Sequence, residues 1–212
     1  MLESSYIESD KEVFMSEHFD QSARNWDQRP MSQQLAQVVP KLLEILPLAP
    51  TQHLLDFGAG TGMLAVPLAG KVRQVTALDT SEKMLEVLDE KGVGNIKTLQ
   101  QDVFAGLEDR FEGIVSCMAL HHVEDTAALM RVFAEHLQPG GYLGLVDLYK
   151  EDGSFHGDNA AKGVKHLGFE PEELKSLMGK AGLESVQFQE ILQIQHKNAR
   201  QYPLFLVTAR KP

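Results

Sequence analysis

The chain has little that would suit it to nucleic acid, to an oxidising compartment or to metal binding. Twenty Lys and Arg stand against thirty Asp and Glu, which leaves a net charge of -10, and no basic run offsets it. Such a chain repels a phosphate backbone, so we expect no nucleic-acid partner. The single cysteine, Cys117, leaves no intramolecular disulfide framework and no Cys-rich metal motif. We therefore expect a reducing compartment and no metal.

Long apolar runs are missing as well. No stretch approaches the ~18 to 20 residues that cross a bilayer. The acidic start MLESSYIESDKE has neither the basic region nor the apolar core of a signal peptide. We therefore expect a cytoplasmic protein with no membrane partner. Its 212 residues, 43% hydrophobic and 24% charged, suit a single domain over residues 1–212.

Short apolar runs alternate with helical patterns from His53 onward. Strands followed by helices predict a mostly parallel sheet with helices on both faces. Two closing runs, Ser185–Gln195 and Leu204–Ala209, are too close together for a crossover helix, so we expect them to pair antiparallel. The predicted fold is α/β: a doubly wound, Rossmann-like, mostly parallel seven-stranded sheet with an antiparallel C-terminal strand. The first five strands are expected near 53–57, 74–78, 96–100, 113–118 and 142–147, and the helices near 62–69, 81–91, 125–137 and 171–181.

The segment 1–47 precedes the first strand and is predicted to be a helical extension. Within it, Met31–Leu46 places apolar residues at helical spacing. We expect one continuous helix over that stretch.

The most informative motif is LLDFGAGTG, from Leu54 to Gly62. An apolar strand carries Asp56 near its end and then breaks into glycine at every second position. Glycine lets the backbone lie against a ligand, and we expect free N–H groups of the next helix to point at that ligand. A nucleoside-bearing cofactor is the expected occupant.

Acidic residues after successive strands narrow the choice of cofactor. Asp79 ends the second strand, where a carboxylate can bind both ribose hydroxyls. That position suits a nicotinamide dinucleotide or S-adenosylmethionine. Met63 replaces the third glycine of a dinucleotide loop, and Asp56 would face a cation better than a phosphate. Asp102 follows the third strand, where it can accept from an adenine amine while Val103 donates its N–H. These features favour adenosylmethionine and leave an NAD(P)-dependent oxidoreductase as the alternative.

Taken together, the motifs resemble those of the class I S-adenosylmethionine-dependent methyltransferases. LLDFGAGTG resembles the first motif of that family, VTALDTSEKML the second, QQDVF the third and IVSCMALHHV the fourth, while LQPGGYL resembles the turn before the fifth strand. The resemblance is strongest to small-molecule methyltransferases with a helical N-terminal lid. It implies adenosylmethionine as cofactor, adenosylhomocysteine as product and a small-molecule acceptor. The nucleobase motifs of the superfamily are absent from Ser116–Ala119.

The resemblance also implies a set of cofactor contacts. The glycine loop would pass under the methionine part, Asp79 would bind the ribose and Met84 would pack on the adenine. Trp26 and Asp27 would contact the cofactor from the lid. The expected cofactor-binding residues are Asp56, Gly58, Ala59, Gly60, Gly62, Asp79, Thr80, Met84, Asp102, Val103, Met118 and Trp26.

Methyl transfer from a sulfonium needs alignment of donor and acceptor more than it needs a base. If a base is used, His121 and His122 are the candidates, because they follow the fourth strand and imidazole titrates near neutrality. The loop after the fifth strand brings Asp147, Tyr149, Phe155 and His156 to the same edge of the sheet, and His166 and Tyr202 are weaker acceptor-side candidates. Without a clear base, a non-catalytic adenosylmethionine-binding partner protein is a further alternative.

Overall fold

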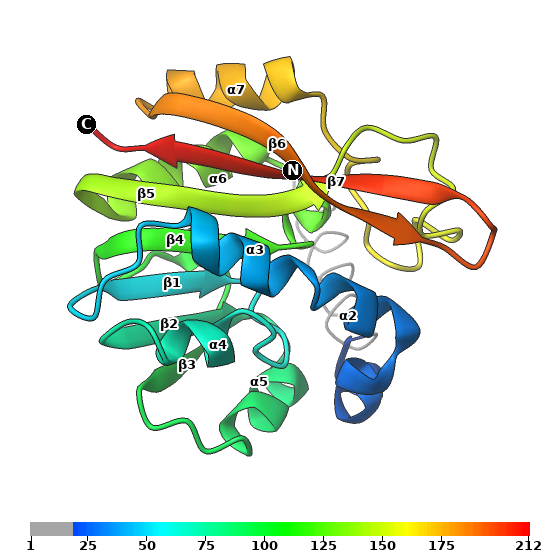
Figure 1. The fold of residues 1–212 in the computed structure, drawn as a ribbon, viewed down its shortest axis with the longest axis horizontal. Coiled ribbons are helices and arrows are strands. Elements are labelled where there is room, and N and C mark those ends of the chain that lie inside the picture. Colours follow the sequence, from blue (N-terminus) through cyan, green and yellow to red (C-terminus); the bar gives the residue numbers. More distant parts are fainter. Residues whose placement is uncertain (1–18) are drawn as a thin grey trace, which may run out of the picture.

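A seven-stranded sheet runs through residues 19–212, the part of the chain that the computed structural model describes (Figure 1). The strand order is β3-β2-β1-β4-β5-β7-β6. The strands are β1 His53–Phe57, β2 Gln74–Asp79, β3 Ile96–Gln100, β4 Phe111–Cys117, β5 Leu137–Leu148, β6 Glu184–Gln195 and β7 Gln201–Arg210. The helices are α2 Pro30–Leu35, α3 Val38–Ile45, α4 Ala65–Ala69, α5 Glu82–Asp89, α6 Thr126–His136 and α7 Pro171–Lys180, with short 3₁₀ helices η1 Ala23–Gln28, η2 Val103–Ala105 and η3 Leu120–His122.

Strand pairing confirms the predicted fold. Strand β1 lies between β2 and β4 and is parallel to both, and β2–β3 and β4–β5 are also parallel pairs. Strand β7 inserts between β5 and β6 and is antiparallel to each. The carboxyl ends of β1 to β5 therefore meet at one edge of the sheet, where ligands bind in open α/β folds.

Helices cover both faces of the sheet and divide the core in two. On one face, Leu42 of α3, Leu68 of α4 and Leu88 of α5 are buried in a common cluster. On the other face, Phe133 of α6 and Met178 of α7 lie in a second cluster, and neither side chain is exposed. Both faces of β1 and β4 are covered, which is why these strands read as near-continuous apolar runs.

Helix starts follow the local chemistry that the sequence predicts. Ser81 precedes α5, and its hydroxyl accepts the backbone N–H of Met84 at 3.2 Å. Asp125 caps α6 by accepting the N–H of Ala128 at 2.7 Å. Pro171 occupies the first turn of α7, where its missing N–H costs nothing.

Two predicted elements have different boundaries. The continuous helix expected over Met31–Leu46 is wrong, because a turn at 36–37 separates α2 from α3. Pro40 explains the break: a proline is tolerated in the first turn of α3 but would disrupt the interior of one long helix. The fifth strand also begins earlier than predicted, at Leu137. It includes Gly140 at φ +77°, so LQPGG belongs to the irregular start of β5.

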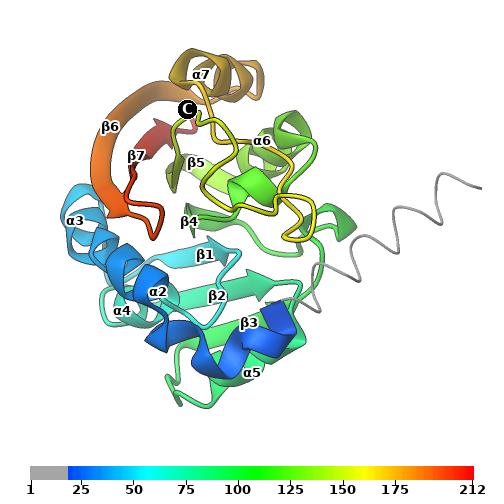
Figure 2. The same ribbon diagram turned by 90° about the vertical axis from the view of Figure 1, so that its right-hand side faces the viewer.

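Two segments from distant parts of the sequence lie at the carboxyl edge of the sheet. Figure 2 looks onto this edge and shows the blue N-terminal segment, which includes α2, across its lower part and the loop between β5 and α7 across its upper part. Within residues 19–212, no helix is both long and apolar enough to span a membrane.

Candidate active site

The glycine loop after β1 packs closely against its surroundings at two of its three glycines. A Cβ added at Gly58 would lie 2.4 Å from the Cβ of Ala119, and one at Gly62 would lie 2.3 Å from Cδ1 of Leu88. Gly60 has φ +54° and would meet nothing within 4 Å. The outer glycines therefore serve packing, whereas the space beside Gly60 is open to a ligand.

The N–H groups of this loop are used inside the protein. Those of Gly58 and Ala59 both donate to the carbonyl of Leu78, at 2.9 and 3.0 Å, and that of Gly62 donates to the carbonyl of Ala59. At the start of α4, the N–H of Ala65 bonds to Asp56. Of these residues only Ala65 belongs to the following helix, so the expectation of free helix N–H groups is wrong at Ala65, while Gly58, Ala59 and Gly62 use their N–H groups to hold the turn. A pyrophosphate would find no donor among them.

Asp79 lies at the end of β2 beside the loop. Its Oδ2 accepts the N–H of Gly60 at 2.8 Å, and its Oδ1 accepts the N–H of Ser81 at 2.9 Å. Burial raises the pKa of Asp79, although these backbone N–H groups act in the opposite direction. Ser81 is the residue that caps α5, so Asp79 is not needed for that role. Each carboxylate oxygen has a second lone pair for a hydroxyl donor.

Asp56 is almost fully buried at the end of β1, with 1% exposure. Its Oδ2 has no hydrogen-bond partner. Burial raises the pKa of Asp56 to about 8, and the nearby charge of Asp79 acts in the same direction. An unpartnered buried carboxyl oxygen is costly unless a ligand supplies a donor.

Asp102 follows β3 at the same edge, as predicted. Its Oδ1 accepts the N–H of Phe104 at 2.8 Å at the start of η2, and its side chain is exposed. The adjacent Gln101 donates its N–H to the carbonyl of Asp79 at 3.2 Å, which ties the ends of β2 and β3 together. Of the other predicted residues here, Val103 and Met84 are buried and Thr80 is exposed.

The end of β4 has a strained backbone where the glycine loop approaches it. Met118 has φ +61°, which is uncommon for a residue with a side chain and occurs often at functional sites. Its N–H donates to the carbonyl of Val146 at 2.9 Å, and Ala119 then contacts Gly58. Burial raises the pKa of the neighbouring Cys117 thiol, so that thiol is a poor nucleophile at neutral pH.

The predicted histidines, His121 and His122, come shortly after β4 in the sequence. Each has a hydrogen-bond partner in β5 or in the loop that follows it. His121 is 1% exposed, and its Nδ1 lies 2.8 Å from Oδ1 of Asp147. His122 is partly buried, and its Nδ1 lies 3.2 Å from the carbonyl of Gly163. The Nε2 atoms of His121 and His156 are 3.1 Å apart. His121 is thus reached through His156 rather than directly from the surface.

The pairing of Asp147 with His121 is the part of the site that sequence reasoning missed. Asp147 was expected only as part of a loop over the site, but it lies in β5 and is completely buried. The available signal was its position: a lone carboxylate in the apolar run GLVDL must find a partner when that strand is buried. Which partner it finds is decided by the pairing of β4 with β5.

Residues of the N-terminal segment contact the same edge. Asp27 accepts a hydrogen bond from the hydroxyl of Thr61 in the glycine loop, and Lys91 donates to Asp27 at 2.7 Å. Trp26 is partly buried, with Phe19 against its ring at 5.6 Å. Phe19 in turn contacts the ring of His122 at 5.6 Å. The segment therefore joins the glycine loop to the histidines.

Comparison with known proteins shows the family to which the chain belongs. A family model described as a methyltransferase domain matches residues 26–187, more than half of the chain. The chain belongs to this methyltransferase family. The resemblance to the class I methyltransferases is thereby confirmed, and the sheet has the mostly parallel strands and the antiparallel C-terminal strand that were predicted.

Curated relatives align with part of the chain. This chain is 29% identical over 153 residues to an uncharacterized methyltransferase of Schizosaccharomyces pombe. The alignment covers 63% of this chain and 54% of that protein. The chain is 32% identical over 146 residues to a ubiquinone biosynthesis O-methyltransferase of Albidiferax ferrireducens, with coverage of 64% and 58%. The chain thus spans little more than half the length of these relatives.

Among solved structures, the chain is similar to the one titled the DhpI–SAH complex. The TM-score is 0.74 at 20% identity, over 94% of this chain and 96% of that chain. At this identity the likeness concerns the fold. Within residues 19–212, no group of three or more His, Cys, Asp or Glu side chains is arranged to hold a metal ion.

Two weaker candidates have structural roles. His166 Nε2 lies 2.9 Å from the carbonyl of Val123 and 3.1 Å from the hydroxyl of Thr126. The Tyr202 hydroxyl bonds to Ser154 at 2.6 Å and to Asn198 at 2.7 Å. Both residues hold the loop after β5 in place.

Proposed function

We propose that this protein transfers the methyl group of S-adenosylmethionine to a small-molecule acceptor. When bound, this cofactor supplies a methyl group already activated on a sulfonium sulfur. The observation that carries the proposal is the contrast between the loop and Asp56. The N–H groups of Gly58, Ala59, Gly60 and Gly62 already have partners within the protein, whereas the buried Oδ2 of Asp56 has none. A cationic ligand suits such a site and an anionic one does not.

The residues around the open space beside Gly60 fit the parts of this cofactor. Asp79 would accept hydrogen bonds from the ribose hydroxyls with the acceptor capacity that its backbone partners Gly60, Ser81 and Thr80 leave unused. Asp102 would accept from the adenine amine, and the N–H of Val103 would donate to the ring. The remaining proposed contacts are Asp56, Gly58, Ala59, Gly62, Thr80, Met84, Met118 and Trp26.

Segment 1–47 would act as a helical lid on a single domain that spans residues 1–212. The bonds from Asp27 to Thr61 and Lys91 support closure over the glycine loop. The part of the proposed lid before residue 19 lies outside the described residues. A lid matters for this chemistry because it excludes water and aligns donor with acceptor, and alignment can supply ~7 to 11 kcal/mol of the barrier.

Several features favour a small-molecule acceptor and a cytoplasmic setting. The net charge of -10 disfavours nucleic acid, and the single cysteine suits a reducing compartment. A ubiquinone biosynthesis O-methyltransferase among the relatives makes hydroxyl-bearing metabolites the first acceptors to screen.

Binding of the cofactor product tests the proposal. Isothermal calorimetry with adenosylhomocysteine should show one site, and Asp79→Ala should weaken binding by about 10- to 100-fold, since it removes charge-assisted hydrogen bonds. Asp109→Ala is the matched control, because Asp109 is an exposed acidic residue outside the site. Binding of NADH without binding of adenosylhomocysteine would reject the proposal in favour of the oxidoreductase.

Turnover separates an enzyme from a binding protein. A screen of small metabolites with methyl-labelled adenosylmethionine should transfer label to at least one acceptor. If adenosylhomocysteine binds but no acceptor is labelled, the non-catalytic partner protein is the better reading.

A further inference from the structure

Three histidine rings from two segments lie together beside the proposed cofactor site. The centroid of the His121 ring is 4.2 Å from that of His122 and 4.9 Å from that of His156. His121 and His122 belong to η3, whereas His156 comes from the loop after β5. The cluster begins two residues after Ala119, which packs against Gly58 of the glycine loop. It therefore borders the place where the methyl group would be presented.

Asp147 fixes the orientation of the innermost ring. Its Oδ1 lies 2.8 Å from Nδ1 of His121, and its Oδ2 accepts the backbone N–H of His121 at 3.2 Å. Burial alone would raise the pKa of Asp147, but His121 and the N–H of Leu148 hold it below the ordinary value. Asp147 is therefore a carboxylate, and His121 must donate from Nδ1. The Nε2 of His121 is left to face His156.

The contact between His121 and His156 requires a proton. Two bare Nε2 lone pairs at 3.1 Å would repel each other, so one nitrogen donates to the other. With both rings neutral and Nδ1 of His121 protonated, the donor is Nε2 of His156. Burial lowers the pKa of His156 to about 3. The neighbouring side chains His121, His122 and Lys162 act in the same direction, and Asp147 acts in the opposite one. Positive charge is thus disfavoured on His156, whereas Nδ1 of His121 lies 2.8 Å from the carboxylate of Asp147.

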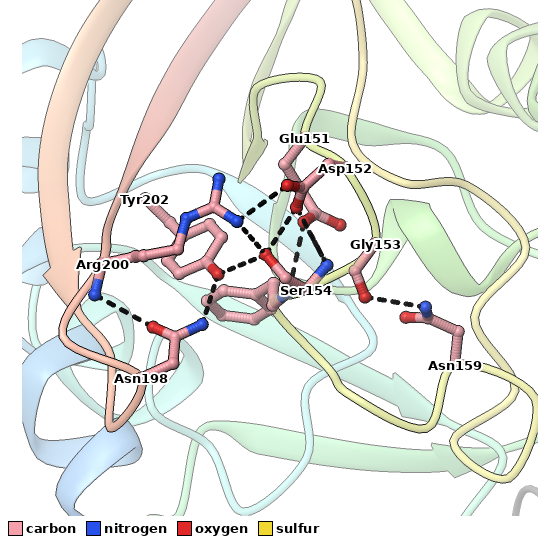
Figure 3. A network of polar contacts seen from close by, with 9 residues as sticks. Glu151, Asp152, Gly153, Ser154, Asn159, Asn198, Arg200 and Tyr202 are labelled. Atoms are coloured by element: carbon pink, nitrogen blue, oxygen red, sulfur yellow. Dashed lines mark hydrogen bonds and ion pairs between the residues drawn. The ribbon is translucent and has the colours of Figure 1, made fainter.

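The loop that carries His156 is anchored on both sides (Figure 3). Before His156, Arg200 of the β6–β7 hairpin bonds to Asp152 at 2.8 Å and to Ser154 at 2.6 Å. After it, Lys162 donates to the carbonyl of His156 at 2.6 Å. His156 itself is only partly buried, so it is the member of the chain that a substrate can reach.

We propose that His156 accepts the proton of the methyl acceptor and passes a second proton to His121, which Asp147 holds in position. This inference rests on the methyl transfer proposed above. The acceptor X–H bond breaks and its proton goes to Nδ1 of His156, while the proton on Nε2 of His156 moves to Nε2 of His121. An X–CH₃ bond forms as the S–CH₃ bond breaks, and the sulfur keeps the electron pair. His156 ends neutral, and the charge rests on His121 beside the carboxylate of Asp147.

This relay identifies the class of acceptor. A thiol reacts as a thiolate that is already present near neutral pH, and a neutral amine attacks through its lone pair before it loses a proton. A hydroxyl group keeps its proton at neutral pH and is a weak nucleophile until a base removes it. The acceptor is therefore a hydroxyl-bearing small molecule.

Nitrogen NMR of ¹⁵N-histidine-labelled protein with adenosylhomocysteine bound tests the relay without turnover. We expect His121 protonated at Nδ1 and a ¹⁵N–¹⁵N coupling across the hydrogen bond between Nε2 of His121 and Nε2 of His156. The coupling should vanish in His156→Ala and persist in the control His136→Gln, which lies on α6. The relay would be overturned if Nδ1 of His121 carries no proton, or if the wild type shows no coupling between the two Nε2 atoms.

Kinetics with the best hydroxyl acceptor from the label screen adds a second test. His156→Ala should lower kcat by about 10²- to 10⁴-fold, the usual contribution of a general base, and added imidazole should restore part of it. Asp147→Asn should lower kcat with little change in KM, as expected of a positioning residue. Unchanged kcat in His156→Ala, or transfer to thiols and amines only, would refute the inference. If the wild-type protein does not bind adenosylhomocysteine, the proposed function itself is refuted.

Discussion

At the scale of single residues, the unusual group is Asp56. It is buried, one oxygen has no partner, and its pKa is raised to about 8 from 3.8. In the absence of a cationic ligand, the folded protein therefore keeps a proton on Asp56 that the unfolded chain releases near pH 4. Such a carboxyl is retained at a cost in stability, which is typical of a group whose role lies in ligand binding.

This linkage predicts how stability depends on pH. Between about pH 4 and pH 8 the folded state binds more protons at Asp56 than the unfolded state, so this carboxyl makes the free energy of unfolding fall as the pH rises. Asp56→Asn should remove that fall, worth on the order of a few kcal/mol. Urea unfolding at about pH 5 and about pH 8 measures it, with the exposed Asp109→Asn as control. Equal pH dependence in wild type and Asp56→Asn would contradict the assignment.

At the scale of elements, helix ends are set by capping side chains and by proline. Ser81 and Asp125 each accept the backbone N–H of the third residue of their helices, as expected of side chains of their types at that position. Pro40 divides the N-terminal apolar pattern into α2 and α3. Helical spacing alone conceals that division, because the apolar residues keep their period across the turn at 36–37.

The cap of α6 offers a quantitative check. Asp125→Ala removes the acceptor of the Ala128 N–H and should lower the free energy of unfolding by about 1 kcal/mol. Glu135→Ala, at an exposed position in the last turn of the same helix, should change it by less than about 0.5 kcal/mol. Chemical denaturation gives both values. If the two variants match, the Asp125 cap contributes nothing beyond an ordinary surface residue.

At the scale of the whole molecule, the site depends on segments that are far apart in the sequence. The N-terminal segment reaches the glycine loop through Asp27, and Lys91 donates both to Asp27 and to the carbonyl of Thr61, each at 2.7 Å. Lys91 and Thr61 hold the pKa of Asp27 below its ordinary value against the opposing effect of burial. Asp27 is thus a charged link between the proposed lid and the loop.

Breaking that link should speed the release of ligand. We expect Asp27→Ala to raise the dissociation rate of adenosylhomocysteine by about tenfold, equivalent to about 1.4 kcal/mol, the scale of one charge-assisted hydrogen bond. Stopped-flow displacement measures this rate. Arg24→Ala is the matched control. Arg24 lies in η1 like Asp27, and the substitution removes only its exposed ion pair with Glu90. A similar rate in both variants would argue against a lid that closes through Asp27.

The order of elements and the cofactor edge were predictable because both depend on local patterns. Alternating strand and helix signals predict the parallel sheet, and carboxylates after successive strands must meet at one edge of it. Asp56, Asp79 and Asp102 follow that rule, since β1, β2 and β3 are neighbours. Antiparallel pairing of the last two strands was equally readable from their short connection.

By itself, the sequence determined the fold, the family and the location of the glycine loop, because periodicity, turn chemistry and motif spacing act over short stretches of chain. Only the tertiary structure decided which groups meet across that edge. The loop N–H groups are consumed by Leu78, Asp79 and Ala59, and His121 lies between Asp147 and His156. Such partners come from strand register and loop packing over long separations, and buried polar groups must take whichever partners that packing brings within reach.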